Sequence, residues 1–245
     1  MKQYGLIGLP LEHSFSKKYF TKKFAKENTN VQYELYELEN ILQFKELIKN
    51  ENLCGLNVTI PYKELIIPYL DEVDEVAAKI GAVNVIKFIR ENETLKLKGF
   101  NSDAVGFENS IKPFLKSPHK KALILGTGGA SKAIEFILGK LGIEVKFVSR
   151  SVCKNKLIYS DLDGNILSEY LLVVNATPLG TFPNIDTCPD IPYQFLTERH
   201  LLFDVVYNPA ETLFMKKGKA QGATVLNGEE MLIGQAEEAW RIWNS

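Results

Sequence analysis

The segment Gly55–Lys63, GLNVTIPYK, places three polar side chains at the exit of an apolar strand. Asn57, Thr59 and Lys63 supply an amide, a hydroxyl and an ammonium group there. A strand that serves only a core carries apolar residues on alternate positions and then turns. The cluster therefore indicates a site for an oxygen-rich ligand. The alternative is a strand-end turn with a solvated lysine, and this short segment alone does not separate the two.

Lys63 and Asp103 are the pair best suited to acid–base chemistry. Each closes a small polar motif at a predicted strand end, and for Asp103 that motif is GFNSD. A lysine beside a carboxylate can stabilise a developing oxyanion and pass it a proton. We expect Lys63 to be the principal acid/base group and Asp103 to orient lysine and substrate. The competing interpretation is a surface ion pair, the commoner fate of such residues.

Ser14 and Ser16, in the motif HSFS that begins at His13, lie two positions apart. In an extended segment both hydroxyls would face one side, where they could hold a carboxylate without a full positive charge. The alternative is helix capping, for which serine is a preferred residue.

A glycine-rich turn, GTGGAS, follows the apolar strand KALIL and precedes a helical pattern. Gly126 permits the tight turn and Gly128 lets the backbone approach a pyrophosphate, while Ser131 is small enough for helix and strand to pack closely. Gly129 and Ala130 open the helix, whose free amides point at the phosphate. The alternative is a tight strand-to-helix turn without a ligand.

The next strand ends in Ser149, Arg150 and Ser151, with Lys154 nearby, at the place where NAD-binding proteins commonly carry an acidic residue. A planar cation with two hydroxyls suits a 2′-phosphate, so we expect a preference for NADP(H) over NAD. The alternative is a solvated arginine. Only Val152–Tyr159 separates this motif from the turn DLDGNIL, so we expect the helix after the strand to be shortened or absent. The sequence therefore does not predict which residues form the adenine pocket.

The composition is that of an ordinary globular protein. The 245 residues are 45% hydrophobic and 24% charged, and 29 Lys and Arg against 30 Asp and Glu give a net charge of −1. We therefore expect a small-molecule substrate, and neither nucleic acid nor a membrane as partner. Met1 leads within three residues into the strand-like YGLIG, and no apolar run approaches the ~20 residues of a membrane span, so we expect a cytoplasmic protein.

The cysteines and histidines are scattered along the chain. Cys54, Cys153 and Cys188 form no CxxC pair, and we expect no metal site.

Short apolar runs alternate with helical patterns, which predicts βαβ units with mainly parallel strands. Helices are expected near 16–26, 41–49 and 103–115, and a second strand–turn–helix–strand unit begins at Lys121. A domain boundary is expected between Asn101 and Lys121. The sequence thus predicts an α/β fold of two domains, the second of Rossmann type.

Taken in order, HSFS, NVTIPYK, GAVN, GFNSD, GTGGAS and the late NGEEMLIGQAEEAW resemble the shikimate dehydrogenase family over nearly the whole chain. The resemblance implies a discontinuous substrate-binding catalytic domain, residues 1–103 and 229–245, and a Rossmann-type NADP-binding domain, residues 104–228, with the active site in the cleft between them. Lys17 stands where many members have proline, which alters the turn but removes no binding group.

The resemblance also implies roles for single residues. It assigns the substrate carboxylate to Ser14 and Ser16, with Tyr207 close by, and the surroundings of the reacting oxygen to Lys63 and Asp103. It implies that the ring hydroxyls are bound by Thr59, Asn84 and Gln235. Asn57 is left open, because its amide can equally hold backbone. The nicotinamide side of the cofactor is assigned to Thr177, Gly228 and Met231.

The function implied is the reversible, NADPH-dependent reduction of 3-dehydroshikimate to shikimate in aromatic amino acid biosynthesis. A near alternative is a quinate/shikimate dehydrogenase that prefers NAD. A different class is a catalytically silent sensor of dinucleotide or shikimate, which would not need a proton donor. The sequence is compatible with a monomer or a homodimer.

Overall fold

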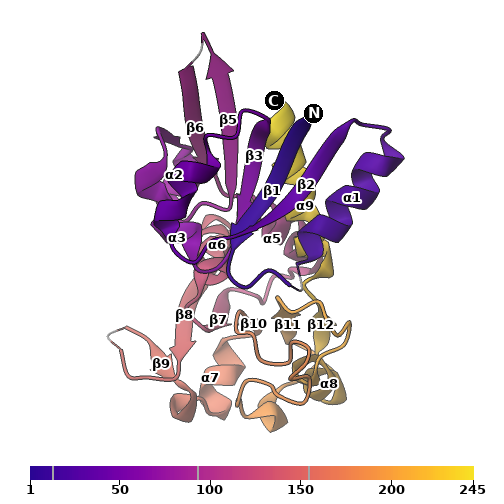
Figure 1. The fold of residues 1–245 in the computed structure, drawn as a ribbon. Coiled ribbons are helices and arrows are strands. Elements are labelled where there is room, and N and C mark those ends of the chain that lie inside the picture. Colours follow the sequence, from indigo (N-terminus) through magenta and orange to yellow (C-terminus); the bar gives the residue numbers. More distant parts are fainter. Residues whose placement is uncertain (13, 93, 154) are drawn as a thin grey trace. The chain divides into compact units, whose positions relative to one another are not determined.

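The computed structural model describes residues 1–12, 14–92, 94–153 and 155–245. The chain packs as two compact units, each built on its own six-stranded sheet (Figure 1). Unit 1 comprises Met1–Ser102 and Ala236–Ser245, and unit 2 comprises Asp103–Gln235.

The sheet of unit 1 has the strand order β2-β1-β3-β5-β6-β4. Its strands are β1 (Lys2–Gly8), β2 (Val31–Glu37), β3 (Leu53–Val58), β4 (Glu72–Val73), β5 (Val85–Glu91) and β6 (Thr94–Phe100). Strands β2, β1 and β3 are parallel, whereas β5 is antiparallel to both β3 and β6. The expectation of mainly parallel strands is confirmed, with β5 as the exception, because it forms an antiparallel hairpin with β6.

The helices of unit 1 are α1 (Phe15–Lys26), α2 (Phe44–Leu47), α3 (Tyr62–Leu65) and α4 (Glu75–Ile80), with 3₁₀ turns at Ile41–Gln43 and Ile67–Tyr69. The segment expected as one helix near 41–49 is thus a 3₁₀ turn followed by a single α-helical turn. Helix α4 begins where the Asp74 side chain accepts from the Val76 amide and ends at Gly81, which has a φ of 71°.

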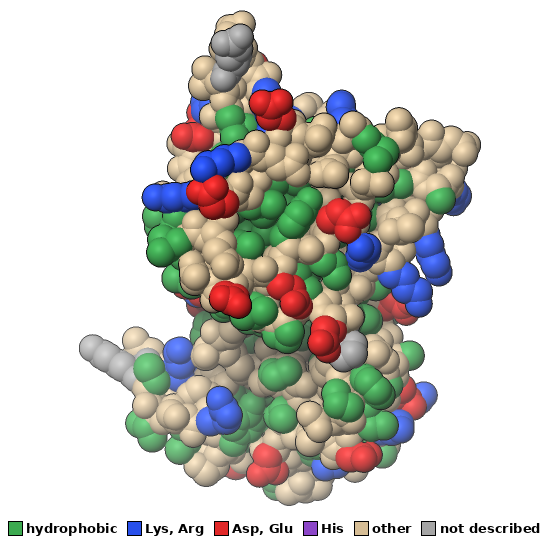
Figure 2. Space-filling view, in the orientation of Figure 1, with side chains coloured by type: hydrophobic (Ala, Val, Ile, Leu, Met, Phe, Trp, Pro, Cys, Tyr) green, Lys and Arg blue, Asp and Glu red, His purple; other side chains and the backbone are tan. Residues whose placement is uncertain are grey.

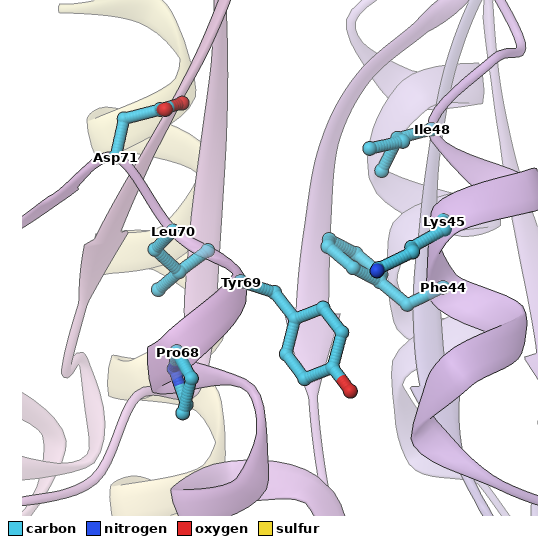
Figure 3. Close-up of a pocket in the computed structure, with 7 residues that line it drawn as sticks. All are labelled: Phe44, Lys45, Ile48, Pro68, Tyr69, Leu70 and Asp71. Carbon is cyan, nitrogen blue, oxygen red and sulfur yellow. The ribbon is translucent and has the colours of Figure 1, made fainter.

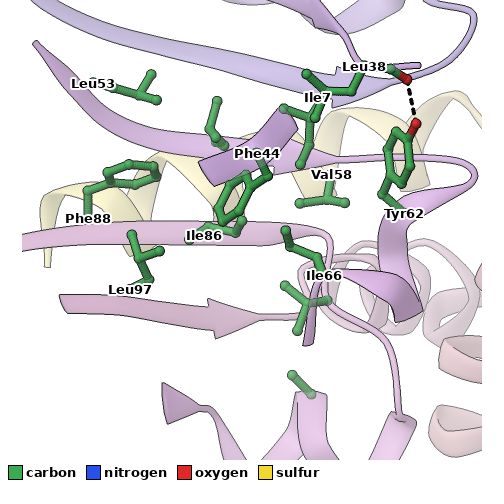
Figure 4. Close-up of a cluster of buried hydrophobic side chains, with 13 residues drawn as sticks. Ile7, Leu38, Phe44, Leu53, Val58, Tyr62, Ile66, Ile86, Phe88 and Leu97 are labelled. Carbon is green, nitrogen blue, oxygen red and sulfur yellow. Dashed lines mark hydrogen bonds between the residues drawn. The ribbon is translucent and has the colours of Figure 1, made fainter. Parts of the chain in front are cut away.

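Alternate residues of the strands pack on opposite faces of this sheet. Ile7, Val58 and Ile86 belong to one core cluster with Phe44, Tyr62 and Ile66 of the short helices and turns, and the Tyr62 hydroxyl donates to the Leu38 carbonyl (Figure 4). The opposite face carries an aromatic cluster from β1, β2, α1 and the distal half of α9 (Glu229–Asn244). Its members include Tyr4, Phe20, Phe24, Tyr33, Trp240 and Trp243.

The sheet of unit 2 has the order β12-β11-β10-β7-β8-β9, and all of its pairs are parallel. The strands are β7 (Lys121–Leu125), β8 (Glu144–Ser149), β9 (Leu157–Ile158), β10 (Leu172–Asn175), β11 (Leu201–Asp204) and β12 (Thr224–Leu226). This is the doubly wound order in which the sequence direction reverses between β7 and β10, and ligands of such sheets bind outside the carboxyl ends at that point.

The helices of unit 2 are α5 (Asp103–Ile111), α6 (Gly129–Lys140), α7 (Gly164–Glu169), α8 (Leu213–Ala220) and the first half of α9, with 3₁₀ turns at Lys112–Phe114, Tyr159–Asp161 and Tyr193–Phe195. The helix expected near 103–115 therefore ends at Ile111 and continues as a 3₁₀ turn. Helix α6 buries Ala133, Ile134, Ile137 and Leu138, which lie on one face at helical spacing.

Charged side chains of both signs are interspersed over the face seen in Figure 2. Within the described part of the chain, no helix combines the length and apolarity that a membrane crossing requires.

Candidate active site

Four of the predicted motifs lie at one edge of the sheet of unit 1. The HSFS motif follows the end of β1 and NVTIPYK ends β3. Because β5 runs antiparallel to β3 and β6, its start lies beside their ends, with Val85 opposite both Asn57 and Phe100. GAVN, which precedes β5, and GFNSD, which ends β6, are thereby brought to the same edge.

Lys63 is the second residue of α3, a single turn that starts directly after β3. Its backbone carbonyl accepts from the Val83 amide at 2.8 Å, which ties this turn to the GAVN motif. Thr59 is partly buried and packs so close to the end of β1 that a Cβ on Gly8 would lie 2.4 Å from its Cγ2. A glycine at position 8 is therefore needed for Thr59 to occupy this place.

Asn57 is used within the scaffold. It is 4% exposed, its side-chain nitrogen donates to the Asn84 carbonyl at 3.3 Å, and its oxygen accepts from the Tyr33 hydroxyl at 2.7 Å. Both ends of the amide thus hold protein groups. The sequence left the role of Asn57 open, and its hydrogen bonds to Tyr33 and to the Asn84 backbone account for it.

Asn84 is 3% exposed and clamps the GFNSD motif. Its side-chain oxygen accepts from the Ser102 amide at 2.6 Å, and its nitrogen donates to the Ser102 hydroxyl at 3.0 Å. Asp103 follows directly, is 6% exposed, and is the first residue of α5 and of unit 2. Lys63 belongs to unit 1.

The two serines do not lie on one extended segment. Ser14 is the N-cap residue of α1, whereas Ser16 lies inside its first turn. The prediction of an extended pair is wrong because the helix begins at Phe15 and rotates Ser16 away from the period of a strand. His13 of the same motif and Lys154 near Arg150 lie outside the described residues.

Ser14 nevertheless differs from an ordinary capping serine. Its side chain makes no capping hydrogen bond, and Oγ is buried without a hydrogen-bond partner among the residues that the structure describes. Ser16 instead forms a hydrogen bond with the buried Tyr33 hydroxyl. Burial raises the pKa of Tyr33, and the bond to Ser16 offsets part of that rise. A buried hydroxyl without a partner is costly, and a ligand oxygen at Ser14 would satisfy it.

In unit 2, α5 and α9 approach each other closely at two glycines. A Cβ on Gly106 would lie 2.4 Å from the Met231 carbonyl oxygen and 2.9 Å from the Gln235 amide, and a Cβ on Gly234 would lie 3.1 Å from the Gly106 Cα. This packing places Met231 and Gln235 against Gly106, which follows Asp103 by about one helical turn of α5. Gln235 is 9% exposed and donates to the Leu232 carbonyl at 2.9 Å.

The glycine-rich turn fits a dinucleotide. Gly126 has a φ of 100°, and a Cβ there would lie 2.9 Å from Thr177 Cγ2 after β10. Gly128, the N-cap of α6, has open space around the position of a Cβ. Gly129 and Ala130 begin α6, and Ser131 closes the turn by donating to the Gly128 carbonyl at 2.6 Å. The open backbone and the N-terminus of this twelve-residue helix are the features that a pyrophosphate uses.

Thr177 is held by a buried polar network at the ends of β10 and β11. The Asn175 side-chain oxygen accepts from the Thr177 amide at 3.0 Å and from its hydroxyl at 2.6 Å, and Asn175 donates to Asp204 at 2.9 Å. Asp204 is fully buried, and burial raises its pKa to about 6. Three residues beyond it, the half-buried Tyr207 has its pKa raised by burial.

Gly228 packs against the segment that follows β11. Its amide donates to the Val206 carbonyl at 3.1 Å, and a Cβ would lie 2.1 Å from the Val205 oxygen. No side chain fits here without moving backbone.

Arg150 is exposed at the end of β8, between Ser149 and Ser151. The Ser149 hydroxyl donates to the Ser151 carbonyl at 2.5 Å, which forms a local turn. Burial raises the pKa of Tyr159, and the Arg150 charge offsets part of that rise. Among the described residues between Arg150 and Leu157 there is no helix, and β9 begins at Leu157. The expectation that the helix after this strand is shortened or absent is thus confirmed for these residues.

A surface pocket of about 480 Å³ in unit 1 is lined by none of the predicted site residues (Figure 3). It lies between α2 and the 3₁₀ turn that precedes β4, and the Lys45 ammonium sits 5.9 Å from the centre of the Tyr69 ring. It has no part in the site described above.

Tyr33, Ser102 and Asp204 support the predicted groups and are not among the predicted site residues. Tyr33 lies in VQYELYEL, where nothing in the sequence separates it from tyrosines that only pack. Asp204 could have been found in the sequence, because it ends the apolar run LLFD in LLFDVVYNP. Charged residues are rarely buried, so an aspartate next to a buried strand stands out.

Comparison with known proteins agrees with this arrangement. Residues 6–86 match the family model described as shikimate dehydrogenase substrate binding domain. A shikimate dehydrogenase (NADP(+)) from Methanosphaera stadtmanae is 36% identical over 98% of this chain and 90% of its own length.

Two solved structures have the same fold. Shikimate 5-dehydrogenase from Thermus thermophilus, in complex with NADP(H) and shikimate, is 30% identical, covers 99% of this chain and 93% of its own, and superposes with a TM-score of 0.85. The ligand-free 5-ketofructose reductase of Gluconobacter sp. strain CHM43 is 28% identical over 99% of this chain and 92% of its own, with a TM-score of 0.83. The sequence identity to the dehydrogenases and its extent show that this chain belongs to the shikimate dehydrogenase family.

Proposed function

We propose that the protein catalyses the reversible reduction of 3-dehydroshikimate to shikimate with NADPH. The observation that carries the proposal is the gathering of Ser14, Thr59, Lys63 and Asn84 at one edge of a sheet, in a chain that is 36% identical to a shikimate dehydrogenase (NADP(+)). The relative with 5-ketofructose reductase activity has the same fold, so the fold alone does not select the substrate. The side chains at the sheet edge do so.

The carboxylate of the substrate is assigned to Ser14, Ser16 and Tyr207. Ser14 contributes the clearest support, because its buried hydroxyl has no hydrogen-bond partner among the described residues and can donate to an anion. Thr59, Asn84 and Gln235 are assigned to the ring hydroxyls. 5-Ketofructose has no carboxylate, so the serines provide a basis for discrimination between the two compounds.

The cofactor is assigned to unit 2. Gly126, Gly128, Gly129 and Ala130 would hold the pyrophosphate, and Ser149, Arg150 and Ser151 the 2′-phosphate. Thr177, Gly228 and Met231 would border the nicotinamide. Arg150 is exposed and lies next to two hydroxyls, with no acidic residue at positions 149–151, and this supports NADP over NAD.

In the proposed mechanism Lys63 acts at the substrate oxygen. When bound, the nicotinamide cofactor supplies the hydride that reduces the ketone. As negative charge develops on the carbonyl oxygen, the Lys63 ammonium stabilises it and donates a proton. Asp103 accepts hydrogen bonds from the lysine and from a neighbouring substrate hydroxyl, which fixes the lysine at the reacting oxygen. In the reverse direction Lys63 takes the proton back.

Initial rates test the proposal. We expect turnover with shikimate and NADP, much slower turnover with NAD or quinate, and none with 5-ketofructose and NADPH. Protein carrying Lys63→Ala, purified in the same way, controls for a contaminating host enzyme. Equal rates with quinate and NAD would favour the quinate/shikimate dehydrogenase, and binding of both ligands without turnover would favour the sensor.

The domain bounds proposed from the sequence, 1–103 with 229–245 and 104–228, place both cofactor motifs in one domain. A cytoplasmic location and a monomeric or homodimeric state are likewise proposals. Cell fractionation tests the location, and sedimentation equilibrium tests the oligomeric state.

A further inference from the structure

We propose that Asn175, held in one orientation by the buried Asp204 carboxylate, is a positioning residue for cofactor binding. Its side-chain oxygen fixes the turn that presses Thr177 against the glycine-rich loop. The inference rests on the proposed function, because it takes that loop to be the cofactor site.

The Asp204 carboxylate is fully buried and uses both oxygens. One oxygen accepts from Asn175 at 2.9 Å and from the Val206 amide at 3.0 Å, and the other accepts from the Thr212 hydroxyl at 2.6 Å. Asn175 and Thr212 are also fully buried. A carboxylate at such a position is costly unless donors surround it, so these three bonds are needed for the strand end to fold this way.

The acidic group sets the orientation of the neighbouring amide. A carboxylate facing three donors acts as an acceptor, so Asn175 must turn its nitrogen toward Asp204 and its oxygen the other way. That oxygen then accepts from both the amide and the hydroxyl of Thr177. The nitrogen also donates to the Leu179 carbonyl at 3.4 Å, and this contact favours the same orientation of the amide.

The consequence reaches the glycine-rich loop through a close contact. Thr177 Cγ2 lies 2.9 Å from the position of a Cβ at Gly126, and the Ala176 carbonyl oxygen lies 3.2 Å from the same point. The turn after β10 therefore forms one wall of the loop after β7, at the reversal point of the sheet. A flipped or missing Asn175 amide would break both hydrogen bonds to Thr177, and Thr177 would no longer be held against Gly126.

Asn175→Ala tests the inference first. We expect the KM for NADP to rise about 10-fold or more, because two hydrogen bonds to Thr177 are lost, while the KM for shikimate stays within about twofold. A matched control is Asn165→Ala on the short helix α7 of the same unit, where the exposed amide donates to the nearby Asp163 side chain at 3.3 Å.

A polarity exchange separates positioning from general stability. Asn175→Asp alone sets two carboxylates against each other at about 2.9 Å and should lose NADP affinity more than Asn175→Ala does. The double variant Asn175→Asp with Asp204→Asn restores a donor–acceptor pair between the two side chains with the roles reversed, and position 175 keeps an acceptor for Thr177. The new amide nitrogen at position 204 then faces the Val206 amide, whose hydrogen bond is lost. We expect the double variant to recover part of the NADP affinity that Asn175→Asp loses.

Failure of the exchange to recover NADP affinity, in a double variant with a wild-type melting temperature, would overturn the inference. So would an Asn175→Ala protein with an unchanged KM for NADP. If instead the wild-type protein shows no turnover with any substrate, the proposed function fails. Direct titration with NADP still tests the positioning role in that case.

Discussion

At the scale of single residues, the site separates into groups that face a ligand and groups that hold them. Asn57 has both ends of its amide engaged by Tyr33 and the Asn84 backbone, so it belongs to the second group. We assign Ser14 to the first, since its buried hydroxyl has no hydrogen-bond partner among the described residues. Residue types alone place Asn57 and Ser14 in the same polar class, and only their partners distinguish them.

Lys63→Ala should lower kcat about 10²–10⁴-fold, while shikimate binding changes comparatively little, because the ammonium acts mainly on charge that develops in the transition state. Steady-state kinetics and equilibrium titration measure the two effects. Lys79→Ala, which removes an exposed ammonium paired with Glu75 on α4, should leave both unchanged. Near wild-type turnover in both Lys63→Ala and Asp103→Asn would refute the assigned chemistry.

Arg150→Ala should weaken NADP by about 10-fold or more and NAD only slightly, since NADP alone offers a phosphate for a charge-assisted pair. KM values for both cofactors test this. Arg241→Ala, at an exposed arginine paired with Glu238 one turn away, is the matched control. An equal loss for both cofactors would mean that Arg150 only packs on the adenine.

Replacing both Ser14 and Ser16 with alanine should raise the KM for shikimate strongly and that for NADP little, with the fold retained by circular dichroism. Ser14→Ala alone should account for most of the effect. Ser16 already has a protein partner in Tyr33, and Ser14 Oγ has none among the described residues. Unchanged shikimate affinity in the double variant would refute the assignment of the substrate carboxylate to the two serines.

At the scale of elements, much of the fold follows from sequence patterns. The strand–glycine turn–helix at Lys121–Lys140 is predicted correctly because apolar strand, turn glycines and helical period agree. The β5–β6 hairpin is not, although Asn92, with a φ of 48°, lies in its turn between two runs of alternating polarity. Alternation fixes which side chains face the core, but it does not fix whether a strand pairs parallel or antiparallel.

Strand direction also explains why some site residues can be predicted and others cannot. Lys63 and Asn84 lie in short polar motifs next to strands, so their types stand out in the sequence. Their proximity depends on the antiparallel course of β5, and the support from Tyr33 depends on the pairing of β1 with β2. Such contacts join distant parts of the chain and leave no local signal.

Gly106→Ala should destabilise the protein by about 1–3 kcal/mol, because its Cβ would meet backbone atoms of α9 that cannot rotate away. It should also raise the KM for shikimate by shifting Gln235. Gly139→Ala is the control, since it lies in α6 with open space around the Cβ position and should stabilise by up to about 1 kcal/mol. Thermal melts of both variants give the comparison, and equal melting temperatures would mean that α5 and α9 tolerate a wider separation.

Asp204 should make stability depend on pH. Its pKa is about 6 in the folded state, above its ordinary value of 3.8, so folding favours the protonated form. The stability from this group is fully present below about pH 4 and is lost as pH rises through about 6, on the order of 3 kcal/mol in total. The free energy of unfolding, measured in urea between pH 4 and 7, should therefore contain a contribution that falls as pH rises, and Asp204→Asn should remove that contribution. The same slope in both proteins would mean that other groups dominate.

At the scale of the whole molecule, the proposed chemistry needs groups from both units. Lys63 belongs to unit 1, whereas the glycine-rich turn and Arg150 belong to unit 2. Hydride transfer requires donor and acceptor carbons within roughly 3–3.5 Å. We therefore expect the protein to close around its two ligands.

We expect the angle between the domains to differ between the free and the doubly bound protein, with little change inside either domain. The loops near Asn101–Lys121 and Leu226–Glu229 are the proposed hinges, because hinges use loop and element-end residues. Small-angle scattering with and without shikimate and NADP measures the change. The same angle in both states would show that closure is not required, and the assigned chemistry would stand without it.

Helix α9 also affects the order in which parts of the protein can complete their folds. It starts in unit 2 and ends in unit 1, where Trp243 packs on Tyr4 at 4.7 Å and donates to the Ile86 carbonyl. The ribosome releases β1–β6 first, yet the aromatic core beneath them lacks Trp240 and Trp243 until unit 2 has been synthesised in full. The aromatic core of unit 1 is therefore completed only after the segment that forms unit 2 has been synthesised, and so is the sheet that carries Lys63 and Asn84.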